Sequence, residues 1–135
     1  MTAPWASAYV GIPYRFAGRD RSGCDCWGLV RLVLAERFGV PLQSFVGDYD
    51  SERPQDLADM VSDALPLVGV DRVEAPREGD LALMIIRGQP CHVGVVVGGP
   101  GERNMLHTLN PHDSVLDYYD GTTWRKRLEG FYRVR

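Results

Sequence analysis

The chain has 135 residues, of which 44% are hydrophobic and 24% are charged, as expected for a globular domain with a core of its own. This composition excludes a disordered chain and a small disulfide scaffold. The formal net charge of -3 argues against nucleic-acid binding through a basic face, and the apolar runs are too short for insertion into a membrane. Residues 1–135 are predicted to form one domain.

The first half of the chain is predicted to be helical. Residues 1–10 are typical of a short amphipathic helix. Residues 24–38 give the clearest helical pattern, because their apolar side chains recur on one face. Asp25 stands where an N-cap belongs, and Gly39 followed by Pro41 is a stop signal. A further helix is predicted from Pro54 to about Leu65.

The second half is predicted to be a meandering antiparallel sheet. Its short apolar runs are bounded by Gly, Pro, Asn or Asp, which is typical of strands joined by turns. The runs are residues 80–86, 92–97, 104–109, 114–118 and 130–134. Helices followed by strands indicate an α+β fold.

Cys26 is the candidate nucleophile. A helix that begins near Asp25 places the thiol in the first turn, where free N–H groups and the helix dipole favour an anion and lower a thiol pKa. Gly23 and Gly28 are expected to leave room for a substrate backbone. The alternative is that Cys26 is a small buried hydrophobe on the apolar face of the helix.

Two histidines are candidate partners of Cys26. His92 opens a predicted strand, so its ring is expected at the strand's end rather than in its middle. A cysteine at a helix start that faces such a histidine can lose its thiol proton to the imidazole. His107 lies one strand over and is a candidate to orient the His92 ring; the alternative for both is a structural role. His112 is expected to be exposed in a turn.

Five sequence blocks in this order resemble the NlpC-type cell-wall cysteine peptidases, which have a papain-like fold. They are residues 11–18 around Tyr14, residues 25–30 around Cys26, Gly79-Asp80, residues 92–95 and Leu106-His107. The chain is most similar to small members found in tail tips of phages and gene transfer agents. Trp27 after the cysteine and the ending Gly130-Phe-Tyr-Arg are typical of those members.

The resemblance implies an α+β, papain-like domain in which an N-terminal catalytic helix packs on a central antiparallel sheet, without cofactor or metal. It implies Cys26 as nucleophile, His92 as general base and acid, and His107 as the orienting residue. Tyr14 is implied beside the nucleophile, in substrate binding or the oxyanion site, and Asp25 is implied in the helix start and a substrate subsite. Trp27 is grouped with these substrate-binding residues, and its bulk is expected to reshape the entrance to the site. The implied substrate is the peptidoglycan stem peptide, typically cut between D-glutamate and diaminopimelate.

Cellular placement is a further expectation. The N-terminus shows no secretory signal, and the odd number of cysteines, three, leaves at least one free thiol. We therefore expect a protein made in the cytoplasm and assembled with the tail-tip or baseplate proteins of a phage-like particle. It would act in the periplasm or cell wall, opening the wall for DNA delivery.

Three alternatives remain open from the sequence. The first is a catalytically silent structural tail component with the same fold. The second is an amidase or transferase that shares the Cys–His pair. The third is a zinc site, for which Cys-x-Cys is a poor spacing, built from Cys24, Cys26, Cys91, His92 and His107. Residues 42–78 resemble no known segment, and their Phe45, Tyr49 and acidic residues are expected to line the cleft or contact a partner.

Overall fold

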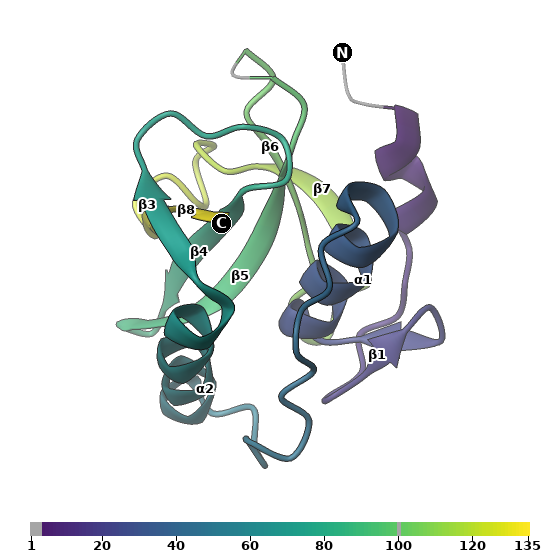
Figure 1. Cartoon of the computed structure of the whole chain (residues 1–135), viewed down its shortest axis with the longest axis vertical. Helices are drawn as coiled ribbons and strands as arrows, with labels where there is room; N and C mark the ends of the chain where they lie inside the picture. Colours follow the sequence, from purple (N-terminus) through teal and green to yellow (C-terminus); the bar gives the residue numbers. More distant parts are fainter. Residues whose placement is uncertain (1–3, 100) are drawn as a thin grey trace.

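A six-stranded antiparallel sheet and two α-helices organise the chain (Figure 1). The structure is a computed structural model that describes residues 4–99 and 101–135. The helical elements are η1 (Pro4–Tyr9), α1 (Cys26–Phe38) and α2 (Pro54–Val68). The strands are β1 (Arg19–Asp20), β2 (Gly23–Cys24), β3 (Val70–Val73), β4 (Leu81–Ile86), β5 (Gln89–Val97), β6 (Asn104–His107), β7 (Val115–Tyr118) and β8 (Leu128–Val134).

Local signals placed the helices where the sequence predicts them. The Asp25 side chain caps α1 by accepting a 2.8 Å hydrogen bond from the Gly28 N–H. Gly39 ends α1 in the left-handed conformation with φ 67°, which glycine adopts without steric cost. Helix α2 runs three residues beyond the predicted end at Leu65 and includes Pro66. The opening helix is a 3₁₀ helix, and residues 1–3 of that prediction lie outside the described residues.

The large sheet has the strand order β3-β8-β4-β5-β6-β7. Strands β4 to β7 form the predicted meander, and β8 returns to pair with β4. Strand β3 was not predicted. It is a short edge strand whose central residues, Asp71 and Arg72, are exposed, so the sequence carries no strong apolar signal for it.

His92 lies inside β5 and not at its start, which corrects the prediction from sequence. Strand β5 begins at Gln89, and His92 pairs with Met84 of β4. The reason is the turn between the two strands: Arg87 and Gly88 both have positive φ, as a two-residue hairpin turn requires. Such a tight turn continues pairing directly from β4 into β5 and extends the strand back beyond His92.

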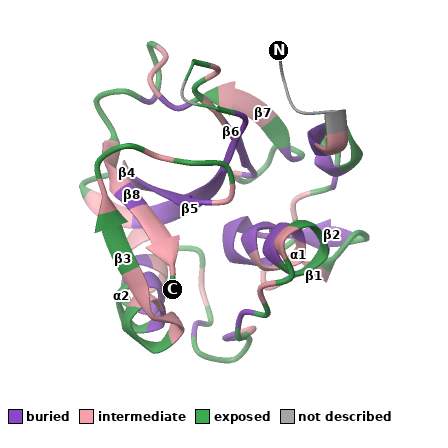
Figure 2. Ribbon diagram, turned by 45° about the horizontal axis from the view of Figure 1, so that its top comes forward, coloured by how far each residue is buried: buried purple, intermediate pink, exposed green. Residues whose placement is uncertain are grey.

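The buried side chains form two clusters. In the first, both α-helices pack against alternate residues of the central strands, such as Leu83, Val93 and Val95. The second cluster contains the intervening residues, such as Met84 and Val96, with Trp124. Successive residues of a strand point to opposite faces, so both faces of the sheet are covered. The burial colouring of Figure 2 follows this arrangement, with α1 and the central strands mostly buried.

Candidate active site

Cys26 and His92 line the same small cavity of about 70 Å³. The cavity lies where the first turn of α1, the start of α2 and strand β5 approach one another. Its other lining residues are Tyr14, Asp25, Glu52, Pro54, Leu57, Ile86, Cys91, Thr108 and Leu109. Leu57 packs on the first buried cluster, whereas Ile86 and Leu109 pack on the second. The cavity therefore lies between the two clusters of buried side chains.

The Cys26 thiol is buried, with 6% of the residue exposed. Its Sγ lies 4.0 Å from the carbonyl oxygen of Cys91. Burial raises the pKa of Cys26 to about 12, and the nearby Asp25 carboxylate acts in the same direction. Backbone N–H groups of Val93 and Trp27 oppose this rise. The expectation of a lowered thiol pKa is thus wrong for this substrate-free site, because desolvation of the thiolate outweighs the favourable helix terminus.

The two histidines predicted to act together are in direct contact. The Nε2 atom of His92 lies 2.8 Å from Nδ1 of His107, and both residues are buried. Burial lowers the pKa of His92 to about 3, and neighbouring His107 adds to this effect. Burial also lowers the pKa of His107, although the contact with Asp117 acts in the opposite direction. In the substrate-free site, the thiol and the His92 imidazole are both neutral at pH 7.

Trp124 contacts the rings of both histidines, and Asp117 contacts His107. The Trp124 ring stacks on His92, with centroids 5.5 Å apart and planes at 26°. It also meets the His107 ring edge to face at 5.1 Å. The Nε1–H of Trp124 donates a 3.0 Å hydrogen bond to Oδ2 of Asp117, and the same oxygen lies 3.5 Å from Nε2 of His107. Neither residue could be assigned to the site from the sequence, because no local pattern links them to the histidines.

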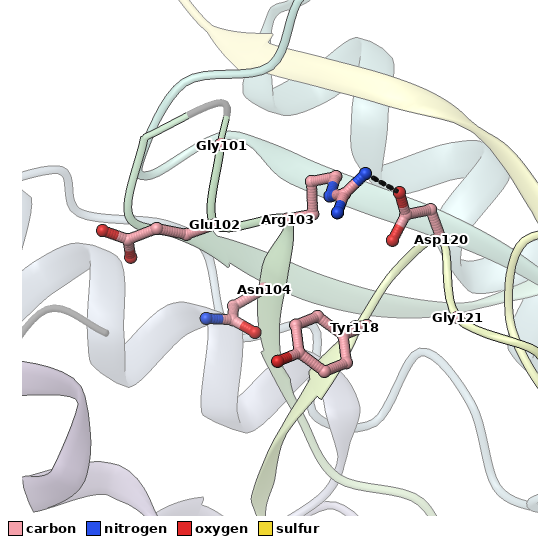
Figure 3. A pocket seen from close by; sticks show the side chains of 7 residues that line it. All are labelled: Gly101, Glu102, Arg103, Asn104, Tyr118, Asp120 and Gly121. Carbon is pink, nitrogen blue, oxygen red and sulfur yellow. Dashed lines mark ion pairs between the residues drawn. The ribbon is translucent and has the colours of Figure 1, made fainter. Parts of the chain in front are cut away.

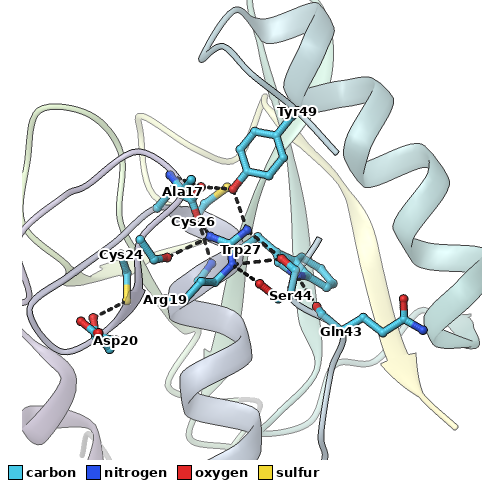
Figure 4. Close-up of polar contacts among 12 residues, drawn as sticks. Ala17, Arg19, Asp20, Cys24, Cys26, Trp27, Gln43, Ser44 and Tyr49 are labelled. Atoms are coloured by element: carbon cyan, nitrogen blue, oxygen red, sulfur yellow. Dashed lines mark hydrogen bonds and ion pairs between the residues drawn. The ribbon is translucent and has the colours of Figure 1, made fainter. Parts of the chain in front are cut away.

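Asp25 is the centre of a buried polar network at the start of α1, and Figure 4 shows its partners Ala17, Arg19 and Tyr49. Its carboxylate accepts hydrogen bonds from the Ala17 N–H at 3.1 Å and from Arg19 Nη1 at 2.8 Å. The Tyr49 hydroxyl also donates to Asp25, and Arg19 donates to the Tyr49 oxygen at 2.7 Å. These donors, together with the cap to α1, hold the carboxylate that precedes the candidate nucleophile.

Tyr14 lies on the cavity wall, as the resemblance implied for a residue beside the nucleophile. Backbone hydrogen bonds of 3.0 Å join Arg15 N–H to the Cys24 carbonyl and Cys24 N–H to the Pro13 carbonyl. The Tyr14 hydroxyl donates to the Glu52 carboxylate, and burial together with this bond raises the tyrosine pKa. Glu52 also accepts a 3.2 Å hydrogen bond from Asn110. Glu52 therefore links Tyr14 on the cavity lining to Asn110 outside it.

Trp27 does not shape the entrance, which corrects the expectation from sequence. Its side chain is fully buried, and its Nε1–H donates a 2.9 Å hydrogen bond to the Gln43 carbonyl (Figure 4). Its ring packs edge to face on Phe45 at 5.6 Å. The physical reason is the direction of the side chain: next to Cys26 on the helix, it turns away from the cavity and into the first buried cluster.

The glycine at position 28 also has a different role from the one expected. A Cβ atom there would lie 2.0 Å from the Gly18 carbonyl oxygen. The space beside Gly28 is therefore filled by the backbone of residues 17–19, and not left open for substrate. This close approach brings Arg19 and the Ala17 N–H within reach of Asp25.

Residues 42–78 contribute to the site partly as predicted. Phe45 and Tyr49 are buried against Trp27 and Asp25, outside the cavity lining. Glu52, one of the acids of this segment, lines the cavity as predicted, together with Pro54 and Leu57. His112 is exposed, as predicted.

Other parts of the structure differ chemically from this cavity. Within residues 4–99 and 101–135, no group of three His, Cys, Asp or Glu side chains is arranged to hold a metal ion. Cys24 lies apart from the cavity lining, and its thiol donates to the Asp20 carbonyl. A wider hollow of about 520 Å³ lies beside Arg103 and Asp120, which form an ion pair there (Figure 3). It contains neither cysteine nor histidine.

None of the described helices is long and apolar enough to cross a membrane.

The chain is similar in sequence to a known murein peptidase. The chain is 25% identical over 126 residues to the murein DD-endopeptidase MepS/murein LD-carboxypeptidase of Escherichia coli K12. The match covers 93% of this chain, which spans 57% of that relative's length.

Solved structures share the fold. The NlpC/p60 domain of the peptidoglycan hydrolase SagA superposes with a TM-score of 0.60 at 22% identity, covering 96% of this chain and 92% of that one. An NlpC/P60 family protein from Bacillus cereus gives a TM-score of 0.66 at 18% identity, with coverage of 96% and 37%. The sequence model of the NlpC/P60 family matches residues 11–133, and the chain therefore belongs to that family.

Proposed function

We propose that this chain is a cysteine peptidase that hydrolyses peptide bonds in bacterial peptidoglycan. The observation that carries the proposal is the placement of Cys26 and His92 on one cavity, with His92 Nε2 held 2.8 Å from His107. A nucleophile, a base and an orienting group are the parts that acyl transfer through a thiol requires. Membership of the NlpC/P60 family and the similarity to a murein endopeptidase support peptidoglycan as the substrate.

The proposed reaction proceeds through an acyl-enzyme. His92 takes the Cys26 proton as the sulfur attacks the substrate carbonyl, and it then gives that proton to the leaving amine. The backbone N–H of Cys26, in the first turn of α1, is proposed as one donor to the developing oxyanion. His92 next activates a water molecule, which hydrolyses the thioester and restores the thiol. His107 keeps the imidazole oriented through both halves of the cycle.

The proposed reaction includes a widening of the cavity when substrate binds. Its volume of about 70 Å³ is small beside a stem peptide. Glu52, which lines the cavity, is bonded to Tyr14 on the same lining and to Asn110 outside it. In the proposed reaction, the incoming peptide displaces Glu52 and bonds to the freed Tyr14 hydroxyl. Asp25, whose carboxylate also lines the cavity, completes the proposed substrate-binding set.

The proposed scissile bond is the one between D-glutamate and diaminopimelate. Its support is the resemblance of the five sequence blocks to NlpC-type peptidases. Mass spectrometry of purified Gram-negative peptidoglycan, incubated with the wild type or with Cys26→Ala, tests both the activity and the bond. New stem-peptide fragments from the wild type alone are expected, and their masses identify the bond. Fragments of equal yield from both proteins would contradict Cys26 as nucleophile.

A catalytically silent structural component is the second candidate function. The observation that favours it is the burial of Cys26 and His92, which raises the pKa of the thiol and lowers the pKa of the imidazole. The peptidoglycan digest separates the two candidates, because a silent component releases no fragments. An amidase or transferase with the same residues is distinguished by the products of the same digest.

We also propose that the protein is carried in the tail tip or baseplate of a phage-like particle and acts in the recipient cell wall. This proposal rests on the resemblance of the Trp27 block and of the ending Gly130-Phe-Tyr-Arg to tail-tip members. Proteomic analysis of purified particles tests it. The chain is expected in intact particles at a fixed copy number, and its absence from them would overturn the proposal.

A further inference from the structure

We propose that Asp117 is a positioning residue that fixes the protons of the two histidines, so that His92 presents a bare nitrogen to Cys26. The inference rests on the proposed function, because it concerns the base of that reaction. It assigns a role to a residue on β7 that lies outside the cavity lining.

The contact with Asp117 determines which nitrogen of His107 carries the proton. Its Nε2 atom is buried and has no hydrogen-bond partner within residues 4–99 and 101–135. The carboxylate Oδ2 of Asp117 faces this nitrogen at 3.5 Å. A carboxylate only accepts, so the contact is favourable when Nε2 carries the ring proton. The other nitrogen of the neutral His107 ring, Nδ1, is then an acceptor.

The proton position on His107 determines the proton position on His92. Its Nε2 lies 2.8 Å from His107 Nδ1, and one of the two nitrogens must supply the shared proton. With His107 Nδ1 fixed as acceptor, His92 Nε2 is the donor. Neutral imidazole carries one proton, so His92 Nδ1 keeps its lone pair. This is the only remaining nitrogen of His92 that can receive the Cys26 proton.

The opposite proton arrangement would disable the base. A proton on His107 Nδ1 would make His92 Nε2 the acceptor and place the His92 proton on Nδ1. The lone pair of His107 Nε2 would then face the Asp117 carboxylate, which is a repulsive contact. His92 would also have no basic nitrogen free for the thiol. One contact on β7 thus selects the catalytically competent state of both rings.

The structure holds Asp117 in place for this role. Trp124 Nε1–H donates to Oδ2 at 3.0 Å, and the backbone N–H of Tyr118 donates to Oδ1 at 2.9 Å. Trp124 is 4% exposed and packs against both histidine rings. The same tryptophan therefore fixes the carboxylate and the two rings relative to one another.

The proton balance of the reaction agrees with this arrangement. When the Cys26 S–H bond breaks, an N–H bond forms at His92 Nδ1, and no proton leaves the site. The new imidazolium retains its Nε2–H bond to His107. Because Asp117 faces the far side of His107, its negative charge stabilises the positive charge through the intervening ring.

Histidine-ring ¹⁵N NMR tests the proton arrangement directly, without any need for turnover. In the wild type, both His92 and His107 are expected as neutral rings protonated at Nε2. In Asp117→Ala, a mixture of Nδ1 and Nε2 forms is expected for both. Asp117→Asn keeps an acceptor oxygen and is expected to restore the wild-type pattern. Asp120→Ala is the matched control, because it removes an exposed carboxylate from the neighbouring hollow (Figure 3). Unchanged ring shifts in Asp117→Ala would overturn the proposal.

Kinetics supply the second readout. Asp117→Ala is expected to lower kcat about tenfold with KM unchanged, because the wrong tautomer removes the base and leaves substrate contacts intact. Asp117→Asn is expected within about threefold of the wild type, and Asp120→Ala is expected to match it.

A double-mutant cycle shows whether Asp117 acts through His107. An asparagine at position 107 offers His92 an amide oxygen whose acceptor role does not depend on a ring proton. In the His107→Asn background, adding Asp117→Ala is therefore expected to cause no further loss of kcat. An additional tenfold loss would contradict action through His107.

The two proposals can fail separately. Wild-type protein that shows the expected ring protons but releases no peptidoglycan fragments leaves the role of Asp117 standing and overturns the proposed function. Protein that hydrolyses peptidoglycan but keeps its ring protons in Asp117→Ala overturns the role of Asp117 alone.

Discussion

The guanidinium of Arg19 and the carboxylate of Asp25 form a buried ion pair of 2.8 Å directly before the candidate nucleophile. Their side chains are only 12% and 4% exposed. Arg19 additionally donates to the backbone carbonyl of Ser44 and to Tyr49, which ties residues 44–49 to the start of α1. The segment between the two helices is therefore anchored to the same carboxylate that caps the catalytic helix.

Removing Asp25 is expected to destabilise the fold. Asp25→Ala leaves the Arg19 charge buried and unpaired and removes the cap of α1. We expect a loss of about 3 kcal/mol in the free energy of unfolding, measured by urea denaturation. The control is Asp71→Ala, which breaks an exposed ion pair with Arg135 and should cost less than about 1 kcal/mol. Equal losses for the two variants would show that the buried pair carries no special weight.

Trp27 is expected to act in the core and not in substrate binding. Trp27→Ala empties a fully buried site and should cost about 4 kcal/mol of stability. Trp27→Phe keeps a ring against Phe45 but loses the bond to Gln43 and part of the buried ring volume, so about 2 kcal/mol is expected. KM for peptidoglycan fragments should be unchanged in Trp27→Phe. A severalfold rise in KM for this folded variant would return Trp27 to the substrate site.

Replacing His92 is expected to lower kcat more than replacing His107. His92→Ala removes the base and should lower kcat about a thousandfold, within the range for general base catalysis. His107→Ala removes only the group that orients His92, and a loss of about tenfold to a hundredfold is expected. Both follow from initial rates on a stem-peptide substrate, with circular dichroism as the check of folding. The reverse order would mean that the base and the orienting residue are exchanged.

The alkylation rate of Cys26 should depend steeply on pH. Burial raises the pKa of the thiol to about 12 and lowers that of His92 to about 3, so both are neutral between these values. The thiolate fraction therefore grows about tenfold per pH unit between pH 7 and 10. Iodoacetamide labelling of Cys26, followed by peptide mass spectrometry, is expected to accelerate in the same proportion. A flat rate from pH 5 to 8 would instead indicate a preformed thiolate–imidazolium pair.

Much of the fold could be predicted because its signals are local. The cap at Asp25 and the stop at Gly39 fix α1 through hydrogen bonds within the helix itself. The runs of alternating or apolar residues gave the meander of β4 to β7, which depends on neighbours in sequence. Strand β3 was not predicted because it is short, partly exposed and paired with β8, about sixty residues later in the sequence.

The candidate site was predictable only in part. Four site residues, Cys26, His92, His107 and Tyr14, were predicted from their sequence blocks. In the structure, Cys26, His92 and Tyr14 line one cavity, and a hydrogen bond joins His92 to His107. The direction of the Trp27 side chain was not predictable, because neighbouring residues in the first turn of a helix point to different surroundings. The pKa shifts also could not be predicted, since they depend on burial by distant segments.

The sequence by itself determined the secondary structure around the nucleophile and the identity of the three residues proposed for catalysis. Only the tertiary structure decided that Arg19 and Tyr49 hold Asp25, that Glu52 closes on Tyr14, and that Asp117 and Trp124 support the histidines. The physical reason is the range of the interactions. Caps, turns and periodicity act over a few residues, whereas desolvation, ion pairing and ring stacking arise only when remote segments pack together.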